Sequence, residues 1–225
     1  MCGRFNVIDN PGLQQLLRDL GVDLKLPPGI NVAPTEAVFL VRNQQGQASA
    51  EAARWWLTPS WASQVDQKYA MFNARSETLA SSRAFSQPFK RQRGIVPMSS
   101  FIEWRSEEGA KQPYLISNAD RALAVAALWD VWSGGDEPLL TCTLVTTAAP
   151  TGIEPGHRRL PVTLAPEECA RWLDNEHPVD ADDPLFRSRL KFDLVISPLS
   201  RAISNARNKE PAAMRPVGEA VTVAA

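Results

Sequence analysis

The sequence contains few cysteines, few histidines and almost no net charge. Its 225 residues include 3 cysteines and 2 histidines, and the formal net charge is −1. Cys2, Cys142 and Cys169 are odd in number and lie far apart. This pattern excludes the paired framework of a disulfide-rich protein and the close ligand spacing of a zinc site. We therefore expect a protein of a reducing cytoplasm that carries no metal ion and no cofactor.

The chain also lacks a long apolar run, a signal-peptide pattern, internal repeats and a low-complexity linker. No apolar run approaches the roughly 20 residues that a membrane-spanning helix needs. The N-terminus has no charged and apolar regions of the signal-peptide kind. Because basic residues do not outnumber acidic ones, a strong positive field over the whole surface, of the kind that attracts nucleic acid, is excluded as well. These absences predict a cytoplasmic protein without a membrane partner.

The sequence is rich in apolar residues, tryptophan and proline. It is 44% hydrophobic and contains 7 tryptophans and 18 prolines. This is enough material for one substantial core, and the prolines favour a loop-rich fold with β-structure over a helical bundle. We predict one domain over residues 1–225, with its core at about 2–210 and a frayed, flexible tail at about 216–225.

Local patterns predict two helices and a series of strands. The first helix begins after Asn10, whose side chain can cap it, with Pro11 in the first turn, and ends at Gly21. A second short helix is expected at 166–173. Strands are expected at 3–8, 37–42, 48–56, 94–101, 112–117, 122–129, 139–147 and 192–196.

The N-terminus carries a reactive pair of groups once its methionine is removed. Cys2 follows Met1, and methionine aminopeptidases remove the first residue when the second is small. The mature chain then begins with an α-amine, of pKa about 7.7–8.0, beside a thiol, and the ammonium favours the thiolate. Such a pair converts an aldehyde into an imine and then into a thiazolidine. Gly3 leaves room for a substrate and Arg4 suits an anion; the alternative is that Cys2 is an accident of a frayed end.

Aromatic side chains crowd the segment 55–61. Trp55, Trp56 and Trp61 fall on both sides of Pro59 and cannot all face inward on one element. We expect Trp61, beyond the proline, to be half exposed. An exposed ring of this kind stacks on unpaired bases, at about 1–3 kcal/mol per base. The alternative is that these rings fill one end of a barrel.

Two polar motifs contain asparagine. Asn31 lies in a segment with prolines on both sides, either as a turn residue that bonds its own backbone or as a fixed contact in the wall of a site. Asn73, Arg75 and Glu77 alternate, so on an extended backbone they share one face. That face is suited to phosphate or sugar oxygens; the alternative is a solvated strand edge.

Basic residues dominate the segment 81–93, which has no acidic residue. They are Arg83, Lys90, Arg91 and Arg93. The acidic clusters lie elsewhere, at 167–168, 174–176 and 180–183. This asymmetry predicts one positive side on a near-neutral protein, which is enough for a short anionic ligand. The alternative is an ordinary solvated face.

Two titratable residues are suited to proton transfer. Glu103 is flanked by apolar residues at the predicted end of a strand, and burial of a carboxyl raises its pKa. His157 lies on a loop beside two arginines, which favour the neutral imidazole. Each has a structural alternative: Glu103 as a surface ion pair with Arg105 or Lys111, and His157 as a structural histidine.

Taken together, these motifs resemble the SRAP (SOS-response-associated peptidase) family, the abasic-site processing proteins. The resemblance spans about residues 2–210. It rests on Cys2-Gly3-Arg4-Phe5, Asn31-Val32-Ala33-Pro34, Trp56 to Trp61, Asn73-Ala74-Arg75-Ser76-Glu77-Thr78, Arg83, Phe101-Ile102-Glu103-Trp104 and His157-Arg158-Arg159-Leu160-Pro161. The resemblance implies a single α+β domain built on a mixed, barrel-like β-structure with a few short covering helices. It also implies a positively charged groove for single-stranded DNA.

The resemblance further implies a chemistry and a set of site residues. Cys2 would crosslink to the ring-opened aldehyde of an abasic site, Asn73 would orient the N-terminus and the opened sugar, and Glu103 and His157 would form the acid/base pair. The implied DNA-binding residues are Gly3, Arg4, Asn31, Trp61, Arg75, Arg83 and Arg158. The implied protein is a monomer of the SOS response that associates with the nucleoid when bound to DNA and has lyase and crosslink-reversal activities.

Two other functions remain open on the sequence. An N-terminal-nucleophile cysteine peptidase would use the same Cys2, with its own Met1 as one substrate. A non-catalytic binder of single-stranded DNA would bind intact and abasic DNA alike and would tolerate mutation of Glu103.

Overall fold

The chain forms two β-sheets that meet at its first strand. The computed structural model describes residues 2–44, 46–66, 68–107, 109–151, 153 and 158–225. Five strands close a mixed barrel in the order β10-β4-β3-β6-β9 and back to β10, with β10 and β4 parallel and the other neighbours antiparallel. They are β3 (Ala37–Gln44), β4 (Gln47–Trp55), β6 (Arg93–Met98), β9 (Leu123–Trp132) and β10 (Leu139–Ala148).

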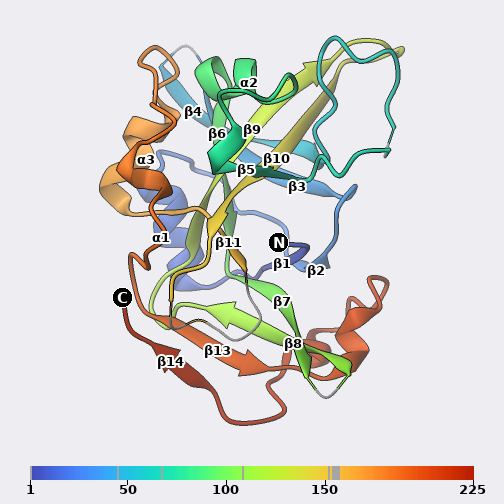
Figure 1. The fold of residues 1–225 in the computed structure, drawn as a ribbon, viewed down its shortest axis with the longest axis vertical. Coiled ribbons are helices and arrows are strands. Elements are labelled where there is room, and N and C mark those ends of the chain that lie inside the picture. The colour runs from blue at the N-terminus through green and yellow to red at the C-terminus, as the bar shows by residue number, and fades with distance from the viewer. Residues whose placement is uncertain (1, 45, 67, 108, 152, 154–157) are drawn as a thin grey trace.

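Short strands extend the barrel. β5 (Asn73–Arg75) and β11 (Arg159–Pro161) pair with β10, and β12 (Thr163–Leu164) pairs with β9. The second sheet has the order β14-β13-β8-β7-β1-β2. Its strands are β1 (Arg4–Val7), β2 (Gly29–Val32), β7 (Ser100–Glu107), β8 (Ala110–Ser117), β13 (Leu194–Pro198) and β14 (Val221–Val223). Figure 1 shows β1 at the waist of the molecule, between the barrel above it and β7, β8, β13 and β14 below it.

Three α-helices occur in the described part of the chain: α1 (Pro11–Asp19), α2 (Ser86–Arg91) and α3 (Pro166–Leu173). As predicted, Asn10 caps α1 by accepting a hydrogen bond from the Leu13 backbone N–H at 2.9 Å. Figure 1 places α1 and α3 along one flank. Single 3₁₀ turns lie at Ser76–Thr78, Pro184–Phe186, Arg201–Ser204 and Pro211–Met214. The α+β class and the barrel-like β-structure with a few short helices are confirmed.

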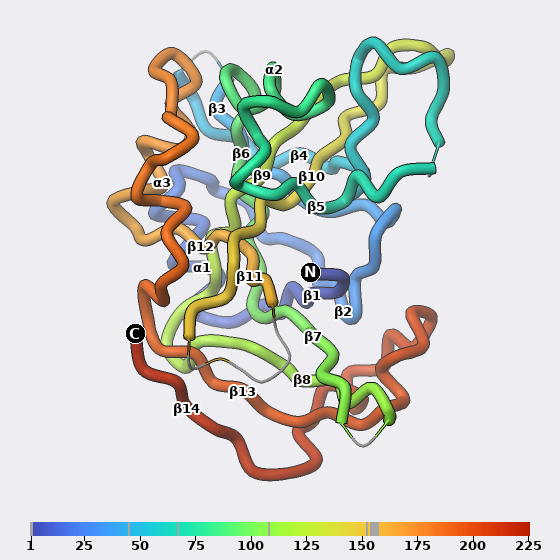
Figure 2. Tube along the Cα trace, in the orientation of Figure 1, coloured from blue at the N-terminus to red at the C-terminus, as the bar shows by residue number. Residues whose placement is uncertain are grey.

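Two segments differ from their predicted structure. The apolar run at 94–101 contains parts of two strands, β6 and β7, because the chain leaves the barrel at Ser99 and enters the second sheet. At this point the Ser99 backbone N–H donates a hydrogen bond of 2.8 Å to the Asn6 carbonyl oxygen, which holds the chain against β1. The terminal segment, where the sequence predicts a frayed tail, contains β14, which runs along β13 at the edge of the sheet (Figure 2).

Arg93 is buried, whereas its place in a basic run predicts an exposed position. Its side chain has no exposed surface. The guanidinium donates hydrogen bonds to the carbonyl groups of Phe89, Lys90, Trp172, Asp174 and His177. It therefore fastens the end of α2 and the end of α3 to the barrel.

We expect Arg93→Met to lower the free energy of unfolding by about 3–5 kcal/mol, because several buried carbonyl groups lose their donor together. Urea unfolding followed by tryptophan fluorescence measures the change. Arg171→Met is the matched control, since Arg171 is 53% exposed and pairs with Asp183 at the surface, where an ion pair contributes about 1 kcal/mol or less. Equal losses in the two variants would contradict the role given to Arg93.

Candidate active site

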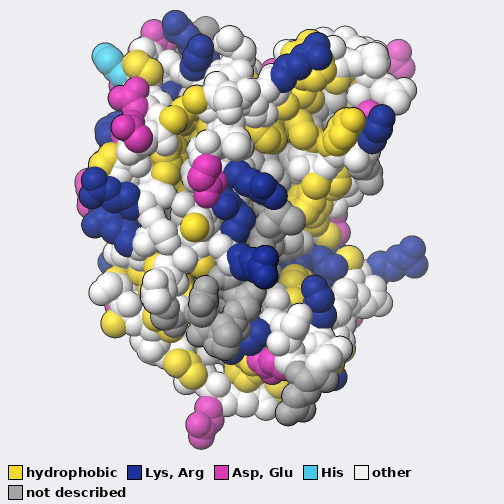
Figure 3. Space-filling view, in the orientation of Figure 1, with side chains coloured by type: hydrophobic (Ala, Val, Ile, Leu, Met, Phe, Trp, Pro, Cys, Tyr) yellow, Lys and Arg dark blue, Asp and Glu magenta, His cyan; other side chains and the backbone are white. Residues whose placement is uncertain are grey.

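A cationic groove lies where the barrel meets the second sheet. Its volume is about 820 Å³ and it is open to solvent. The lining residues are Gly3, Arg4, Pro34, Phe72, Arg75, Glu103, Trp104, Lys111, Arg158, Arg159 and Ser204. Five of these side chains are basic and one is acidic. Figure 3 shows lysine and arginine side chains across the middle of the molecule, beside an apolar surface.

The path of β1 brings the N-terminal residues to the groove. Phe5 pairs with Phe101 of β7 on one side and with Val32 of β2 on the other. Its ring is buried and lies 5.0 Å from the ring of Trp55, measured between centroids. Because β1 is held on both edges and by its core side chain, Gly3 is delivered to the wall of the groove, while Cys2, the residue before it, is fully buried.

Cys2 is anchored from the barrel side. Asn73 Nδ2 donates a hydrogen bond of 2.7 Å to the Cys2 carbonyl oxygen. Asn73 begins β5, which is held parallel to β10 by the pairing of Asn73 with Leu144. Asn73 Oδ1 is buried, and no donor in the described part of the chain bonds to it. One acceptor of this amide therefore remains available beside the N-terminal residue.

Burial changes the acid–base state that the sequence predicts for Cys2. The thiol has no exposed surface, and this burial, followed by the charge of Glu103, raises its pKa well above the ordinary value. The neighbouring ammonium lowers this pKa, as expected, but burial outweighs it. Cys2 is held as a neutral thiol.

Glu103 lies within β7, in its middle rather than at its end. Its register follows from the pairing of Arg4 with Ile102, which places Glu103 alongside the residues that precede β1. The side chain is 6% exposed, and burial raises its pKa to about 7. The predicted poorly solvated carboxyl is present, and near neutral pH it divides between its acid and its base form.

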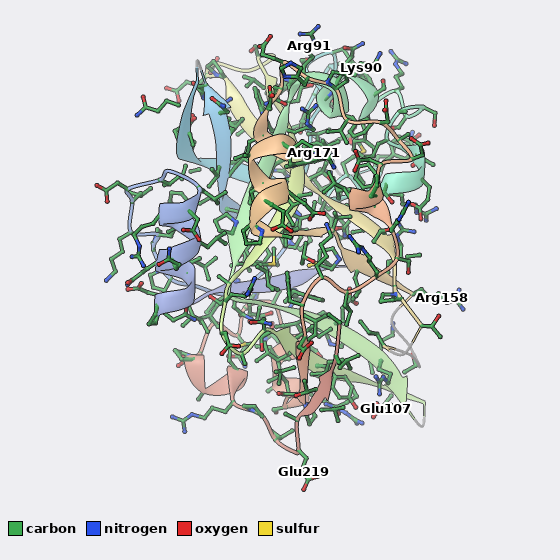
Figure 4. All side chains as sticks on the ribbon, turned by 90° about the vertical axis from the view of Figure 1, so that its left-hand side faces the viewer. Lys90, Arg91, Glu107, Arg158, Arg171 and Glu219 are labelled. Atoms are coloured by element: carbon green, nitrogen blue, oxygen red, sulfur yellow. The ribbon has the colours of Figure 1, made fainter. Side chains whose placement is uncertain are left out.

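The five cations of the groove come from four separate segments. Arg4 belongs to β1, Arg75 to β5, Lys111 to β8 and Arg159 to β11, and Arg158 precedes β11. Figure 4 shows Arg158 projecting outward from the side of the molecule. This convergence gives a near-neutral chain a local positive field without a basic run in its sequence.

The structure divides the predicted face of Asn73, Arg75 and Glu77. Strand β5 ends at Arg75, and Glu77 lies in the following 3₁₀ turn, so the three residues do not share an extended face. Glu77 instead accepts two hydrogen bonds from the Arg159 guanidinium, at 2.9 and 2.8 Å. These bonds lower the pKa of the Glu77 carboxyl and fix one cation at the rim of the groove.

Trp61 and Arg83 lie together outside the residues that line the groove. Trp61 is 54% exposed, as predicted, and the Arg83 guanidinium stacks 4.2 Å from the centroid of its ring. Lys90 and Arg91 lie at the end of the molecule, apart from Arg158 in the view of Figure 4. The basic run of the sequence is thus not the source of the charge in the groove.

Asn31 has no exposed surface and lies behind the groove rather than in its lining. His157 lies outside the described residues, so its proposed part as a proton carrier stays a prediction.

Sequence reasoning missed several residues of the groove. Trp104 and Arg159 belong to motifs that carry the family resemblance, and Phe72 directly precedes one, yet no part in the site is predicted for them. The signal for Trp104 was its place beside Glu103 in alternating strand sequence, which puts the two on opposite faces and exposes one of them. Lys111 and Ser204 carry no such signal, since they reach the groove through contacts distant in sequence.

The described residues contain neither a metal-binding cluster of side chains nor a membrane-spanning helix. No group of three or more His, Cys, Asp or Glu side chains there is placed to hold a metal ion. No helix in that part of the chain is long and apolar enough to cross a membrane.

The fold and the site define a class of protein. It is a closed mixed barrel with a side sheet and a cationic groove between them. A buried carboxyl and Gly3 line the groove, and the adjacent Cys2 is buried and bonded to an amide. The chain belongs to the SRAP family, described as SOS response associated peptidase, whose family model matches residues 1–206. The family resemblance stated from the sequence is confirmed.

Curated relatives cover nearly the whole chain. It is 31% identical over 223 residues to abasic site processing protein YoqW of Bacillus subtilis, covering 94% of this chain and 97% of that protein. It is 30% identical over 227 residues to abasic site processing protein YedK of Escherichia coli, covering 96% and 100%. Abasic site processing protein HMCES of Gallus gallus is 30% identical over 224 residues, covering 84% of this chain and 66% of that protein.

Solved structures share the fold. A protein from Bacteroides thetaiotaomicron matches with a TM-score of 0.80 at 19% identity, covering 96% of this chain and 99% of that chain. A phage-related protein from Bordetella bronchiseptica matches with a TM-score of 0.66 at 23% identity, covering 84% and 89%. At these identities the likeness concerns the fold alone.

Proposed function

We propose that this protein recognises abasic sites in single-stranded DNA and, after removal of Met1, forms a covalent thiazolidine adduct through Cys2. The observation that carries the proposal is the placement of Gly3 and Arg4, which directly follow Cys2, on the wall of a groove lined by five cations and one carboxyl of raised pKa. The names of the curated relatives, which are abasic site processing proteins, support the same substrate.

The reaction joins one aldehyde to one aminothiol and releases one water molecule. The neutral α-amine attacks C1′ of the ring-opened sugar, and a proton moves to the carbonyl oxygen. Loss of water then gives the imine. The Cys2 sulfur adds to the imine carbon, and the thiol proton passes to the nitrogen, which closes the five-membered ring. A buried thiol needs no prior ionisation for this last step, because its proton has an acceptor in the same reaction.

Glu103 is suited to the proton transfers before ring closure. A general acid or base works best when its pKa lies near the operating pH, and burial brings that of Glu103 to about 7. Its carboxylate takes the proton of the α-ammonium, and the resulting acid returns a proton to the departing hydroxyl. We assign the second proton carrier, at the sugar oxygen, to His157.

Asn73 and the cations orient the two reactants. Asn73 Nδ2 already holds the Cys2 carbonyl at 2.7 Å, and its Oδ1 supplies an acceptor for the α-amine. Arg4, Arg75 and Arg158 contact phosphates on both sides of the lesion, with Gly3 allowing close approach of the sugar. Trp61 stacked with Arg83 offers a platform for a base farther along the strand.

The decisive experiment compares four substrates with the Met-processed protein. They are a single-stranded oligonucleotide with one abasic site, its intact counterpart, an abasic duplex, and a set of peptides. We expect a heat-stable adduct with the first, of mass one water less than the sum of its parts, and none with intact DNA. Intact mass of the protein beforehand verifies the loss of Met1.

The other outcomes separate the alternatives. Equal binding of intact and abasic DNA without an adduct would favour a non-catalytic binder. Turnover of peptides without DNA would favour a cysteine peptidase, as the family's description suggests. Either result would overturn the proposed chemistry.

A further inference from the structure

Asn31 is hydrogen-bonded through every polar atom of its backbone and its side chain. Its backbone N–H donates to Asn6 Oδ1 at 2.8 Å, and its carbonyl oxygen accepts from Lys209 Nζ at 2.8 Å. Its side-chain oxygen accepts from Arg4 Nη1 at 2.8 Å. Its side-chain nitrogen is within 3.0 Å of three backbone carbonyl oxygens, those of Ile203, Asn205 and Asn208. The residue has no exposed surface, so no polar atom of Asn31 is left for a ligand.

The backbone conformation of Asn31 places its amide between these partners. Its φ of 51° lies in the left-handed region, which asparagine tolerates better than most residues. Burial of so many polar groups is favourable only while all of them are bonded. This residue therefore links β2, β1 and the segment 203–208, which are distant in sequence.

The segment 203–208 in turn holds the guanidinium of Arg4. Arg4 Nη1 and Nη2 donate to the carbonyl oxygens of Ile203 and Ser204, each at 3.3 Å. The Arg4 guanidinium also lies 5.4 Å from the centroid of the Trp104 ring. Trp104 Nε1 donates to Ser204 Oγ at 3.0 Å. Arg4 is thus fixed in the wall of the groove by groups that Asn31 holds in place.

We propose that Asn31 is a positioning residue for DNA binding: its buried amide fastens the segment 203–208 against β1 and so holds Arg4 at one place in the groove, without touching DNA itself. This inference rests on the proposed function and refines the part that the family resemblance gives to Asn31, which is a direct contact. A fixed guanidinium binds a phosphate with less loss of side-chain entropy than a free one.

The test uses Asn31→Gly, Arg4→Ala and the double variant. Glycine adopts the left-handed backbone without strain, so the first variant removes the amide alone. Binding of an intact single-stranded oligonucleotide is measured at several salt concentrations. One lost phosphate contact reduces the slope of log affinity against log salt by roughly 0.7. We expect both single variants to show this change, with affinity about tenfold lower, and the double variant to equal Arg4→Ala.

A structural role alone gives a different pattern. If Asn31→Gly keeps the salt slope of the unaltered protein, or if the two losses add in the double variant, the inference is overturned. Asn10→Ala is the matched control: it removes another asparagine hydrogen bond, that of the α1 cap, and should lower the melting temperature while leaving the salt slope unchanged.

A second readout requires no DNA. Amide hydrogen exchange in the segment 203–208 should be faster in Asn31→Gly and unchanged in Asn10→Ala, and protection that survives in Asn31→Gly would refute the fastening. If the unaltered protein binds single-stranded DNA but forms no adduct with abasic DNA, the proposed chemistry falls and the positioning role stands. If it binds no single-stranded DNA, both fall.

Discussion

Replacing Cys2 with alanine is expected to remove the heat-stable adduct with abasic DNA, with a loss of more than about a hundredfold. Alanine is also small, so Met1 is still removed and the chain still presents an α-amine. That amine can form the imine, but no sulfur closes the ring, and the imine hydrolyses when the protein is denatured. Intact mass after heating, with the abasic oligonucleotide in excess, measures the adduct.

The same variant separates the two bonds of the adduct. Reduction with borohydride before denaturation converts an imine into a stable amine, so it should restore a covalent product in Cys2→Ala. Cys142→Ala is the matched control, because Cys142 is equally buried, within the barrel, and should leave the adduct intact after heating. A heat-stable adduct in unreduced Cys2→Ala would exclude the thiazolidine.

Features that depend on neighbours in the sequence were easier to predict than the groove, which is assembled from distant segments. Glu103 between apolar neighbours predicts a buried carboxyl, and its pKa is about 7 in the structure. Asn10 before Pro11 predicts the start of α1, which the structure contains. Both predictions depend on interactions within a few residues, where the sequence determines the surroundings of the group.

The remaining features depend on contacts that local patterns do not encode. The groove receives its charge from separate segments rather than from the basic run, whose member Arg93 is buried instead. Arg4 reaches the carbonyl of Ser204, 200 positions away. The neutral state of the Cys2 thiol likewise follows from burial, which the free chain end does not suggest.

Glu103→Gln is expected to slow adduct formation by about 10²–10⁴-fold, the usual contribution of a positioned acid or base. The unaltered protein should show a bell-shaped dependence of rate on pH. Its acid limb lies near pH 7, where Glu103 loses its proton. Its alkaline limb appears when Glu103 and the α-amine are both deprotonated, because no proton is then available for the leaving hydroxyl. In the variant position 103 no longer titrates, so the limb near pH 7 should disappear and the rate should rise with deprotonation of the α-amine, through about pH 7.7–8.0.

Stability measurements show whether this loss reflects chemistry or unfolding. Burial raises the pKa of Glu103 from 4.5 to about 7, so the folded state binds this proton more tightly than the unfolded state. The stabilisation is complete below about pH 4.5 and is lost as pH rises towards 7, a change of about 3 kcal/mol. Glutamine cannot ionise, so the variant should keep its stability across this range and exceed the unaltered protein at pH 8. If Glu103→Gln is slow yet more stable at pH 8, the loss of rate reflects a lost proton carrier and not unfolding. If the variant keeps the bell-shaped dependence of rate on pH, the proton carrier is another group.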